Sequence, residues 1–190
     1  MPDSQSGRER AILAAAMTAF SRYGFARTKM DDIAQASGVA RTALYRTFRD
    51  KEDIFRALAR AVHARALELA KVELAGSAPF RQRLQDALIA RDVHLLEIGH
   101  SGPHANEIAN LYLSLAADLS AQSNDALVGV LARATQAAIR TGAFELRPAF
   151  RSARDFAHIL RLALEGVKKE VKSVKDYERL ARQLIQAMVG

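Results

Sequence analysis

Residues 41–47 concentrate the side chains of this chain that are best suited to bind another molecule. The segment has the sequence Arg-Thr-Ala-Leu-Tyr-Arg-Thr, so two guanidinium groups, two hydroxyls and a phenol lie close together. A guanidinium is a planar fork of N–H donors that matches phosphate oxygens and the acceptor edge of guanine. Hydroxyl and phenol groups also hydrogen-bond phosphate oxygens. The segment therefore favours a polar surface that binds an anionic polymer.

The residues before this segment are those that a helix-turn-helix needs to hold it in place. Thr28 can cap a short helix on which Ile33 and Ala34 face inward. Gly38 then permits a tight turn into a second helix, 40–48, whose polar residues face outward. In a helix-turn-helix the second helix enters the major groove of DNA. The pattern thus predicts DNA binding by residues 41–47.

The chain as a whole is predicted to be all-α, with about nine helices. Apolar residues recur at three- and four-residue spacing nearly everywhere, and no segment alternates as a strand does. We expect a helix-turn-helix head in residues 1–50, a connecting helix in 51–76 and a second helical block in 77–190. The predicted helices are 7–23, 28–38, 40–48, 51–74, 80–98, 105–119, 124–141, 152–171 and 175–189.

Composition narrows the class of protein further. The net charge is +7, and the first 60 residues carry more than half of it, which suits nucleic acid but also an acidic protein or an anionic membrane surface. The chain has no cysteine, so disulfides and thiolate metal sites are excluded. Its apolar runs fall far short of the roughly 20 residues that span a bilayer. We expect a cytoplasmic protein that does not bind a membrane.

The N-terminal quarter resembles the TetR/AcrR family of transcription repressors. The resemblance runs from about Arg10 to Leu58 and rests on several motifs together. It implies a homodimer that binds a double-stranded DNA operator and is released by an unknown small-molecule effector, with a ligand-binding and dimerisation domain in residues 77–190. The motifs are the Ala-Ala-x-x-x-Phe before Gly24-Phe25, the pairs Ile33-Ala34, Gly38-Val39 and Leu44-Tyr45, then Phe48 and Lys51-Glu52.

The resemblance also assigns roles to single residues. Arg46 is the expected base reader, whereas Tyr45 and Lys51 are expected to hold DNA phosphates. The chain departs from the family at Ala40, which leaves the recognition helix without its usual hydroxyl cap, and at Lys29, where a second threonine is common. The expected DNA-binding residues are Thr28, Lys29, Arg41, Thr42, Tyr45, Arg46, Thr47 and Lys51.

The second block offers three candidate effector-binding residues. Arg91 and His94 interrupt the apolar stripe of the predicted helix 80–98, and a buried charge must be paired or change its protonation. Tyr112 is the third candidate. The alternative is an internal salt bridge from Arg91 to an acid such as Glu97 or Glu107, or exposure at a rim.

The last two predicted helices, 152–171 and 175–189, offer a candidate dimer interface. Apolar residues on the first spread over roughly 200° of the helix, about twice the stripe that a surface helix needs. One face could pack internally and the other against a partner chain; alternatively, the whole stripe packs inside one subunit. The expected interface residues are Phe156, Ile159, Leu160, Ala163, Val167, Leu180, Leu184 and Met188.

Two other functions remain open to the sequence. A helical metal-binding or enzymatic bundle would use Arg91, His94, His100 and His104, but no third metal ligand stands at suitable spacing. No nucleophile elbow, phosphate-binding glycine loop or isolated carboxylate pair is present in the sequence, so neither catalysis, a metal nor a cofactor is expected. A helix-turn-helix could also contact protein, without the steep salt dependence of phosphate binding.

Overall fold

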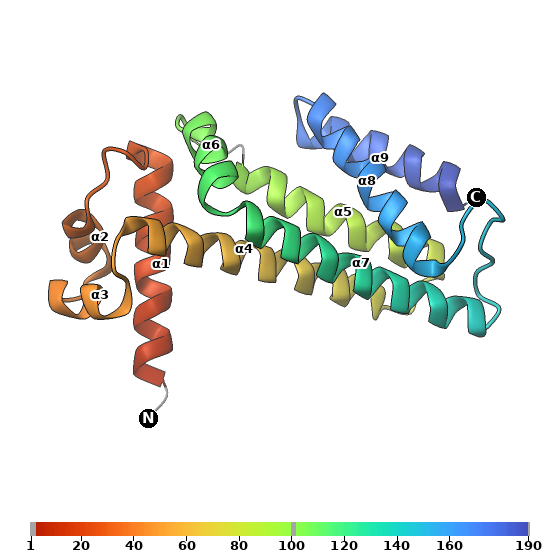
Figure 1. Cartoon of the computed structure of the whole chain (residues 1–190), viewed down its shortest axis with the longest axis horizontal. Helices are drawn as coiled ribbons and strands as arrows, with labels where there is room; N and C mark the ends of the chain where they lie inside the picture. The colour runs from red at the N-terminus through yellow and green to blue at the C-terminus, as the bar shows by residue number, and fades with distance from the viewer. Residues whose placement is uncertain (1–2, 100–101, 190) are drawn as a thin grey trace. The chain divides into compact units, whose positions relative to one another are not determined.

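The computed structural model describes residues 3–99 and 102–189, and within these ranges the chain is helical with no β-strand (Figure 1). The all-α prediction is confirmed. No helix in the described ranges is long and apolar enough to cross a membrane. The helices are α1 (Asp3–Tyr23), α2 (Met30–Ser37), α3 (Arg41–Thr47), α4 (Lys51–Leu74), α5 (Phe80–Gly99), α6 (Ala105–Leu115), α7 (Ala117–Arg140), α8 (Ala153–Glu170) and α9 (Val174–Val189).

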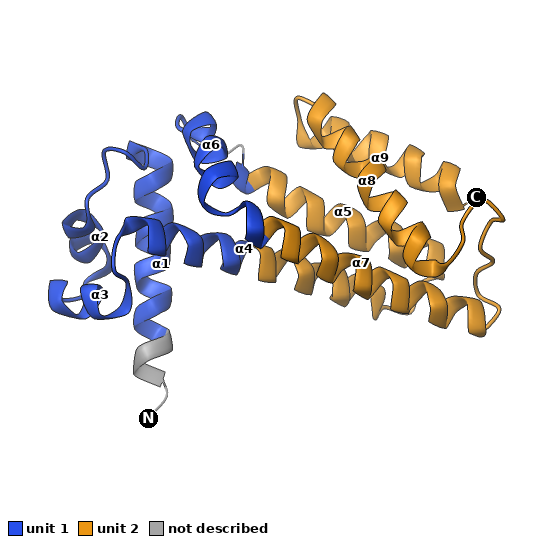
Figure 2. Cartoon of the chain, viewed as in Figure 1, with its two compact units in different colours: residues 1–62, 98–119 blue, residues 63–97, 120–190 orange. Residues whose placement is uncertain are grey.

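The chain forms two compact units (Figure 2). Unit 1 comprises Met1–Val62 and Ile98–Leu119, and unit 2 comprises His63–Glu97 and Ser120–Gly190. This division differs from the predicted ranges because α6 and the first half of α4 fall in unit 1. The physical reason is that apolar residues of α6, such as Ile108, pack on the core of the head.

The core of unit 1 fixes the three helices of the head. Ile12, Ile33, Leu44 and Ile54 are all fully buried and belong to one apolar cluster. Gly24 ends α1 with a φ of +83°, a conformation that other residues rarely adopt. The buried side chains come one from each of α1, α2, α3 and α4, so their packing sets how the short α3 is presented.

The largest differences from the predicted helix boundaries are at the start of α1, which begins at Asp3, four residues before its prediction, and at the end of α6 and the start of α7. A break at Ala116 separates α6 from α7, whereas the sequence predicted helices at 105–119 and 124–141. Arg56 of α4 donates to the carbonyl of Leu115, and its guanidinium binds Asp118 at 2.9 and 2.7 Å. The hydrogen bond from Arg56 lowers the pKa of Asp118 to about 2. No glycine or proline marks this break, so local sequence could not reveal it.

Unit 2 has a second apolar core, built from α5, α7, α8, α9 and the C-terminal half of α4. Helix α8 begins at Ser152, whose hydroxyl accepts from the N–H of Asp155 at 3.1 Å. Phe156 on the buried side of α8 packs against Phe144 with ring centroids 5.8 Å apart. Ala181 and Ile185 of α9 belong to the same cluster. This core therefore leaves only part of α8 and α9 exposed.

Candidate functional site

Helix α3 presents all of its predicted DNA-binding residues to solvent. Its inward residue, Leu44, and the following Phe48 are buried in the core of unit 1. The side chains on the opposite side of the helix are polar. Tyr45, which adds an aromatic ring to this side, is 43% exposed. The exposed residues are Arg41, Thr42, Tyr45, Arg46 and Thr47.

The two arginines of α3 have different surroundings. Arg41 pairs with Asp31 at 2.6 Å and lies over the ring of Tyr45 at 5.5 Å. Arg46 makes no hydrogen bond or ion pair with the residues that the structure describes. Thr47 donates its hydroxyl to the carbonyl of Ala43 at 3.0 Å. Arg46 is therefore the side chain of this surface whose donors are most available to a ligand.

A cleft of about 330 Å³ lies beside α3 and is lined by residues of α3 and by Arg8 of α1. Arg8, Val39, Ala43, Arg46 and Thr47 line this cleft, and no acidic residue is among them. Two guanidinium groups in one concave surface suit a phosphate group. Arg8 was missed by the sequence analysis because nothing local in the sequence places residue 8 beside residue 46; only the packing of the head does so.

Thr28 differs from its predicted role as a helix cap. The N-cap of α2 is Lys29, whose backbone N–H donates to Asp32 at 2.8 Å. Thr28 is only 2% exposed, and its hydroxyl donates to the carbonyl of Gly24 at 2.7 Å. The cap prediction is wrong because the free carbonyl at the end of α1 takes the hydroxyl. A phosphate contact by Thr28 or by the exposed Lys29 stays a prediction, and this burial disfavours it for Thr28.

Ala40 and Lys51 each have a definite structural setting. Ala40 is the N-cap of α3 and makes no side-chain cap hydrogen bond, which confirms the uncapped start. The ammonium of Lys51 donates to the carbonyls of Phe25, Ala26 and Thr28 at 2.8, 3.2 and 3.3 Å. All three of its N–H donors are used. Its phosphate contact stays a prediction, but the structure gives Lys51 the role of fixing the loop between α1 and α2.

Helix α6 fixes the same loop through Glu107. Its carboxylate accepts from the N–H of Ala26 at 2.7 Å, so the backbone of Ala26 is bound by both α6 and Lys51. His104 lies 3.5 Å from Glu107. A Cβ at Gly24 would meet Glu107 at 2.5 Å, so this close approach requires glycine. Beside the loop is a polar cleft of about 560 Å³, lined by Arg22, Tyr23, Arg27, Thr28, Asp32, Gln35, Ala36 and His104.

The three candidate effector residues do not belong to one unit. Tyr112 lies in unit 1, where its ring is 6.5 Å from Phe55 and lines an apolar cavity of about 60 Å³. Arg91 and His94 lie in unit 2. An effector site formed by Arg91, His94 and Tyr112 stays a prediction. Tyr112 lies in another unit than Arg91 and His94.

The metal-binding alternative receives no support from the described residues. His94 is in unit 2 and His104 in unit 1, while His100 lies outside the described ranges. In the part of the chain that the structure describes, no three histidine or acidic side chains are grouped to hold a metal ion.

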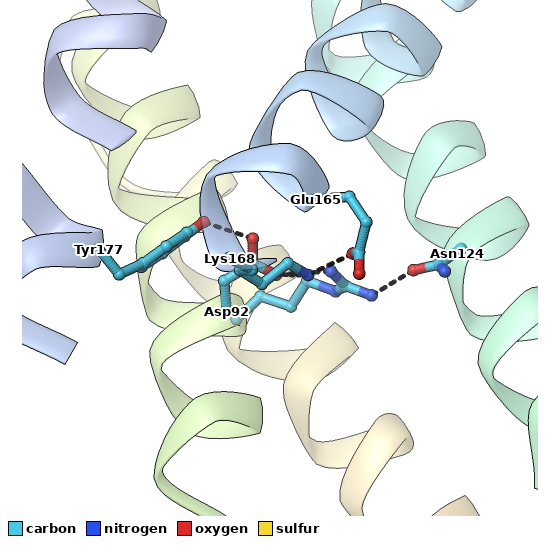
Figure 3. Close-up of polar contacts among 6 residues, drawn as sticks. Asp92, Asn124, Glu165, Lys168 and Tyr177 are labelled. Carbon is cyan, nitrogen blue, oxygen red and sulfur yellow. Dashed lines mark hydrogen bonds and ion pairs between the residues drawn. The ribbon is translucent and has the colours of Figure 1, made fainter. Parts of the chain in front are cut away.

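Arg91 belongs to a buried polar cluster in unit 2, whose labelled members in Figure 3 are Asp92, Asn124, Glu165, Lys168 and Tyr177. The side chain is 2% exposed and pairs with Asp92 at 2.6 Å. Its other terminal nitrogen donates to Asn124 of α7 at 2.6 Å. The internal salt bridge that the sequence offered as the alternative is therefore confirmed, but its acid is Asp92 and not Glu97 or Glu107. Asp92 takes their place because Tyr177 and Lys168 hold its carboxylate beside the guanidinium.

Asp92 connects α5 to both of the last two helices. Its carboxylate accepts from the phenol of Tyr177 on α9 at 2.5 Å and lies 3.4 Å from the ammonium of Lys168 on α8. Lys168 also pairs with Glu165 at 2.7 Å. Burial, reinforced by the negative charge of Asp92, raises the pKa of Tyr177 above its usual value, so the phenol stays protonated as a donor.

His63, on the part of α4 that belongs to unit 2, is influenced by the same cations. The side chain is 7% exposed. Burial lowers the pKa of His63 from 6.5 to about 4, and the charges of Arg91 and Lys168 add to this effect. His63 is therefore neutral near pH 7, and the charges at the centre of unit 2 are those of Arg91, Lys168 and Asp92, with Glu165 at the edge.

The predicted dimer residues divide into two groups. Phe156 and Leu160 are fully buried in the core of unit 2, so their assignment to a dimer interface is wrong: they face the same way on α8 as the core residue Leu164. Ile159 is 38% exposed, and Leu162, which the prediction omitted, is 48% exposed. The remaining predicted residues are partly buried: Ala163, Val167, Leu180, Leu184 and Met188.

The N-terminal part of the chain is similar in sequence to known regulatory proteins. Residues 12–58 match the family model of bacterial regulatory proteins of the tetR family. A segment of 57 residues is 39% identical to the HTH-type transcriptional regulator RutR of Escherichia coli K12, and the match covers 30% of this chain and 27% of RutR. The chain thus matches little more than a quarter of the length of that regulator.

Similar solved structures extend over the whole fold. A transcriptional regulator from Cytophaga hutchinsonii is 19% identical over 96% of this chain and 97% of its own, with a TM-score of 0.78. SmeT, the repressor of the Stenotrophomonas maltophilia multidrug efflux pump SmeDEF, is 20% identical over 96% of this chain and 90% of its own, with a TM-score of 0.66. SmeT has also been solved in complex with triclosan. At these identities the likeness shows the fold.

Proposed function

We propose that this chain, whose residues 12–58 match the model of the tetR family of bacterial regulatory proteins, is a DNA-binding transcription repressor. The observation that carries the proposal is the exposed polar side of α3, with Arg46 unpaired among the described residues and Arg8 beside it in a cleft without acids. Guanidinium groups gathered on an exposed surface without acidic neighbours favour an anionic partner. A regulator of this kind acts in the cytoplasm, where the DNA is.

The side chains of α3 divide the recognition of DNA between them. Arg46 donates two parallel hydrogen bonds to a guanine edge, an interaction worth about 1 to 3 kcal/mol of discrimination. Tyr45, Thr42 and Thr47 hydrogen-bond phosphates and fix the register, while Arg41 can exchange its exposed partner Asp31 for a phosphate. Arg8 binds the phosphate that enters the cleft next to Arg46.

The repressor acts as a homodimer. Ile159 and Leu162 of α8 are exposed apolar side chains, and Leu184 and Met188 of α9 are only partly buried. A second copy of the same surface would cover these residues. Two recognition helices about 34 to 36 Å apart would then enter successive major grooves of a pseudo-palindromic operator.

A small-molecule effector releases the repressor from its operator. SmeT, of the same fold, binds triclosan, and we assign the corresponding function to unit 2 of this chain. By linkage, an effector that weakens DNA binding by a given factor is itself bound more weakly by that factor when DNA is present.

The test is selection of duplexes from a random pool by the purified protein, followed by sequencing. The expected result is a pseudo-palindrome whose affinity falls steeply with salt. Arg46→Ala should lose discrimination at one base of each half-site, while Arg179→Ala, on the exposed side of α9, should select the same sequence. A folded, dimeric protein that retains no preferred duplex would refute the proposal. If the chain instead bound a protein, with an affinity that does not depend on salt, the ligand of α3 would be a protein and not DNA.

A further inference from the structure

The guanidinium of Arg91 has one edge that the chain leaves incompletely bonded. Nη1 donates to the carboxylate of Asp92, and Nη2 donates to the neutral amide oxygen of Asn124 (Figure 3). Nε is buried and finds no hydrogen-bond partner among the described residues. Nε and Nη2 form the side of the guanidinium that binds a carboxylate through two parallel hydrogen bonds. This edge is thus held by one neutral acceptor where it could hold an anion.

The charges around Arg91 are already paired, so what remains open at its edge is a hydrogen-bond donor. Asp92 binds Arg91 at 2.6 Å and also accepts from Tyr177. Lys168 pairs with Glu165 at 2.7 Å and lies 3.4 Å from Asp92. The buried donor at Nε lacks an acceptor, which is costly, and a ligand carboxylate would supply one.

Further buried polar atoms lie on the same two helices. His94 follows Arg91 by one turn of α5, and Ser123 precedes Asn124 on α7. His94 Nε2 and Ser123 Oγ are buried without a partner in the described part of the chain. Apolar residues flank them, because Leu88 of α5 and Leu127 of α7 are in the core of unit 2. Hydrogen-bonding groups among apolar side chains are typical of sites that bind small organic molecules.

We propose that the effector of this protein is a small organic carboxylate that binds side-on to Nε and Nη2 of Arg91. Its carboxylate takes the place of the Asn124 oxygen at Nη2 and also accepts from Nε. Its apolar body lies between α5 and α7, within reach of His94 and Ser123. The proposal names the effector class and rests on the proposed function for its biological role, although binding itself can be measured without DNA.

The first experiment compares ligands that differ only in charge. Benzoate and octanoate are tested against benzamide, octanamide, benzylamine and octylamine by thermal unfolding and calorimetry of the full chain. At 100-fold excess over Kd, a carboxylate should raise Tm by about 5 to 10 °C. The amides and amines should have no effect. Equal stabilisation by the amides, stabilisation by the amines, or none by either carboxylate would overturn the proposal.

Two substitutions at one position form the matched test. Asn124→Asp supplies a carboxylate to the same edge from within the chain, so it should weaken benzoate or octanoate binding by at least about tenfold through like charge. Asn124→Ala leaves the edge open and should bind the carboxylate at least as tightly as the natural chain. If both variants bind it equally, the proposal fails. Neither substitution removes Arg91, so both should fold.

DNA release separates this proposal from the proposed function. With the selected operator, the carboxylate that binds should release the natural chain and Asn124→Ala from DNA, but not Asn124→Asp. If the protein binds DNA but no carboxylate, the carboxylate site is refuted and the proposed DNA-binding function stands. If the protein binds the carboxylate but no DNA, the carboxylate site stands and the proposed DNA-binding function is refuted.

Discussion

Arg46 in unit 1 and Arg91 in unit 2 are residues of the same type in opposite environments. Arg46 is exposed on α3 and has no partner among the described residues, so water solvates its charge and it can exchange that water for DNA. Arg91 is 2% exposed and must be balanced by Asp92. The difference teaches that the head keeps its recognition groups at little cost in stability. Unit 2 instead incorporates its charges into the fold.

The largest expected effect in this comparison is on the stability of unit 2. Arg91→Met leaves the carboxylate of Asp92 buried with one cation fewer, and removing one partner of a buried pair costs about 3 to 5 kcal/mol. Arg46→Met should change the free energy of unfolding by less than about 0.5 kcal/mol, because the side chain is exposed. Urea unfolding of both variants measures the contrast, and equal effects would break it.

The pH dependence of stability should come from unit 2 through His63. Its pKa is about 4 in the folded chain and 6.5 when unfolded, so the unfolded state takes up a proton first as pH falls. Stability contributed by neutral His63 is present above pH 6.5 and is lost between pH 6.5 and 4, by about 3 kcal/mol in total. His63→Gln should flatten the curve of unfolding free energy over this range. An unchanged slope would show that His63 is not the titrating group.

A smaller effect should follow from the link between Asp92 and α9. Tyr177→Phe removes the hydrogen bond from the phenol to the buried carboxylate, and a hydrogen bond to a charged group contributes about 1.5 to 3 kcal/mol. Tyr45→Phe, at an exposed phenol of α3, is the matched change and should leave unfolding unchanged. The comparison is sharpened if only Tyr177→Phe lowers the urea midpoint.

The smallest expected effect on the fold is in the loop that α6 and Lys51 hold. Glu107→Gln keeps an oxygen to accept from Ala26 but loses the charge, and should cost about 0.5 to 1.5 kcal/mol. The N–H of Ala26 should then exchange with deuterium faster than in the natural chain, while the N–H groups of the core helices should exchange at the same rate. Unchanged exchange at Ala26 would show that α6 does not hold the head loop.

Most of the helix ends could be predicted from the sequence, because local signals mark them. Gly24 and Gly38 adopt positive φ at the ends of α1 and α2, and α4 begins at Lys51 as predicted. The exception at Ala116 depends on Arg56, which is about sixty residues away in the sequence. Periodicity cannot detect a helix break that a distant side chain stabilises.

The candidate sites were predicted to different extents for the same reason. The outward side of α3 follows from the helical period, so the exposure of Arg46 was predictable from the position of Leu44. Arg8 was not, since it approaches α3 only through packing. Likewise the sequence marked Arg91 as a charge in an apolar stripe, but not that Asp92 would be its partner.

The sequence by itself determined an all-helical chain, a helix-turn-helix with its polar side outward, and a family resemblance in the first 58 residues. These properties depend on residue types at fixed short spacing, which a helix converts directly into a surface. Only the tertiary structure decided that α6 belongs with the head, that Thr28 and Lys51 bond to the loop before α2, and that Phe156 and Leu160 are core residues. Each of these depends on contacts between helices, whose partners the local period does not specify.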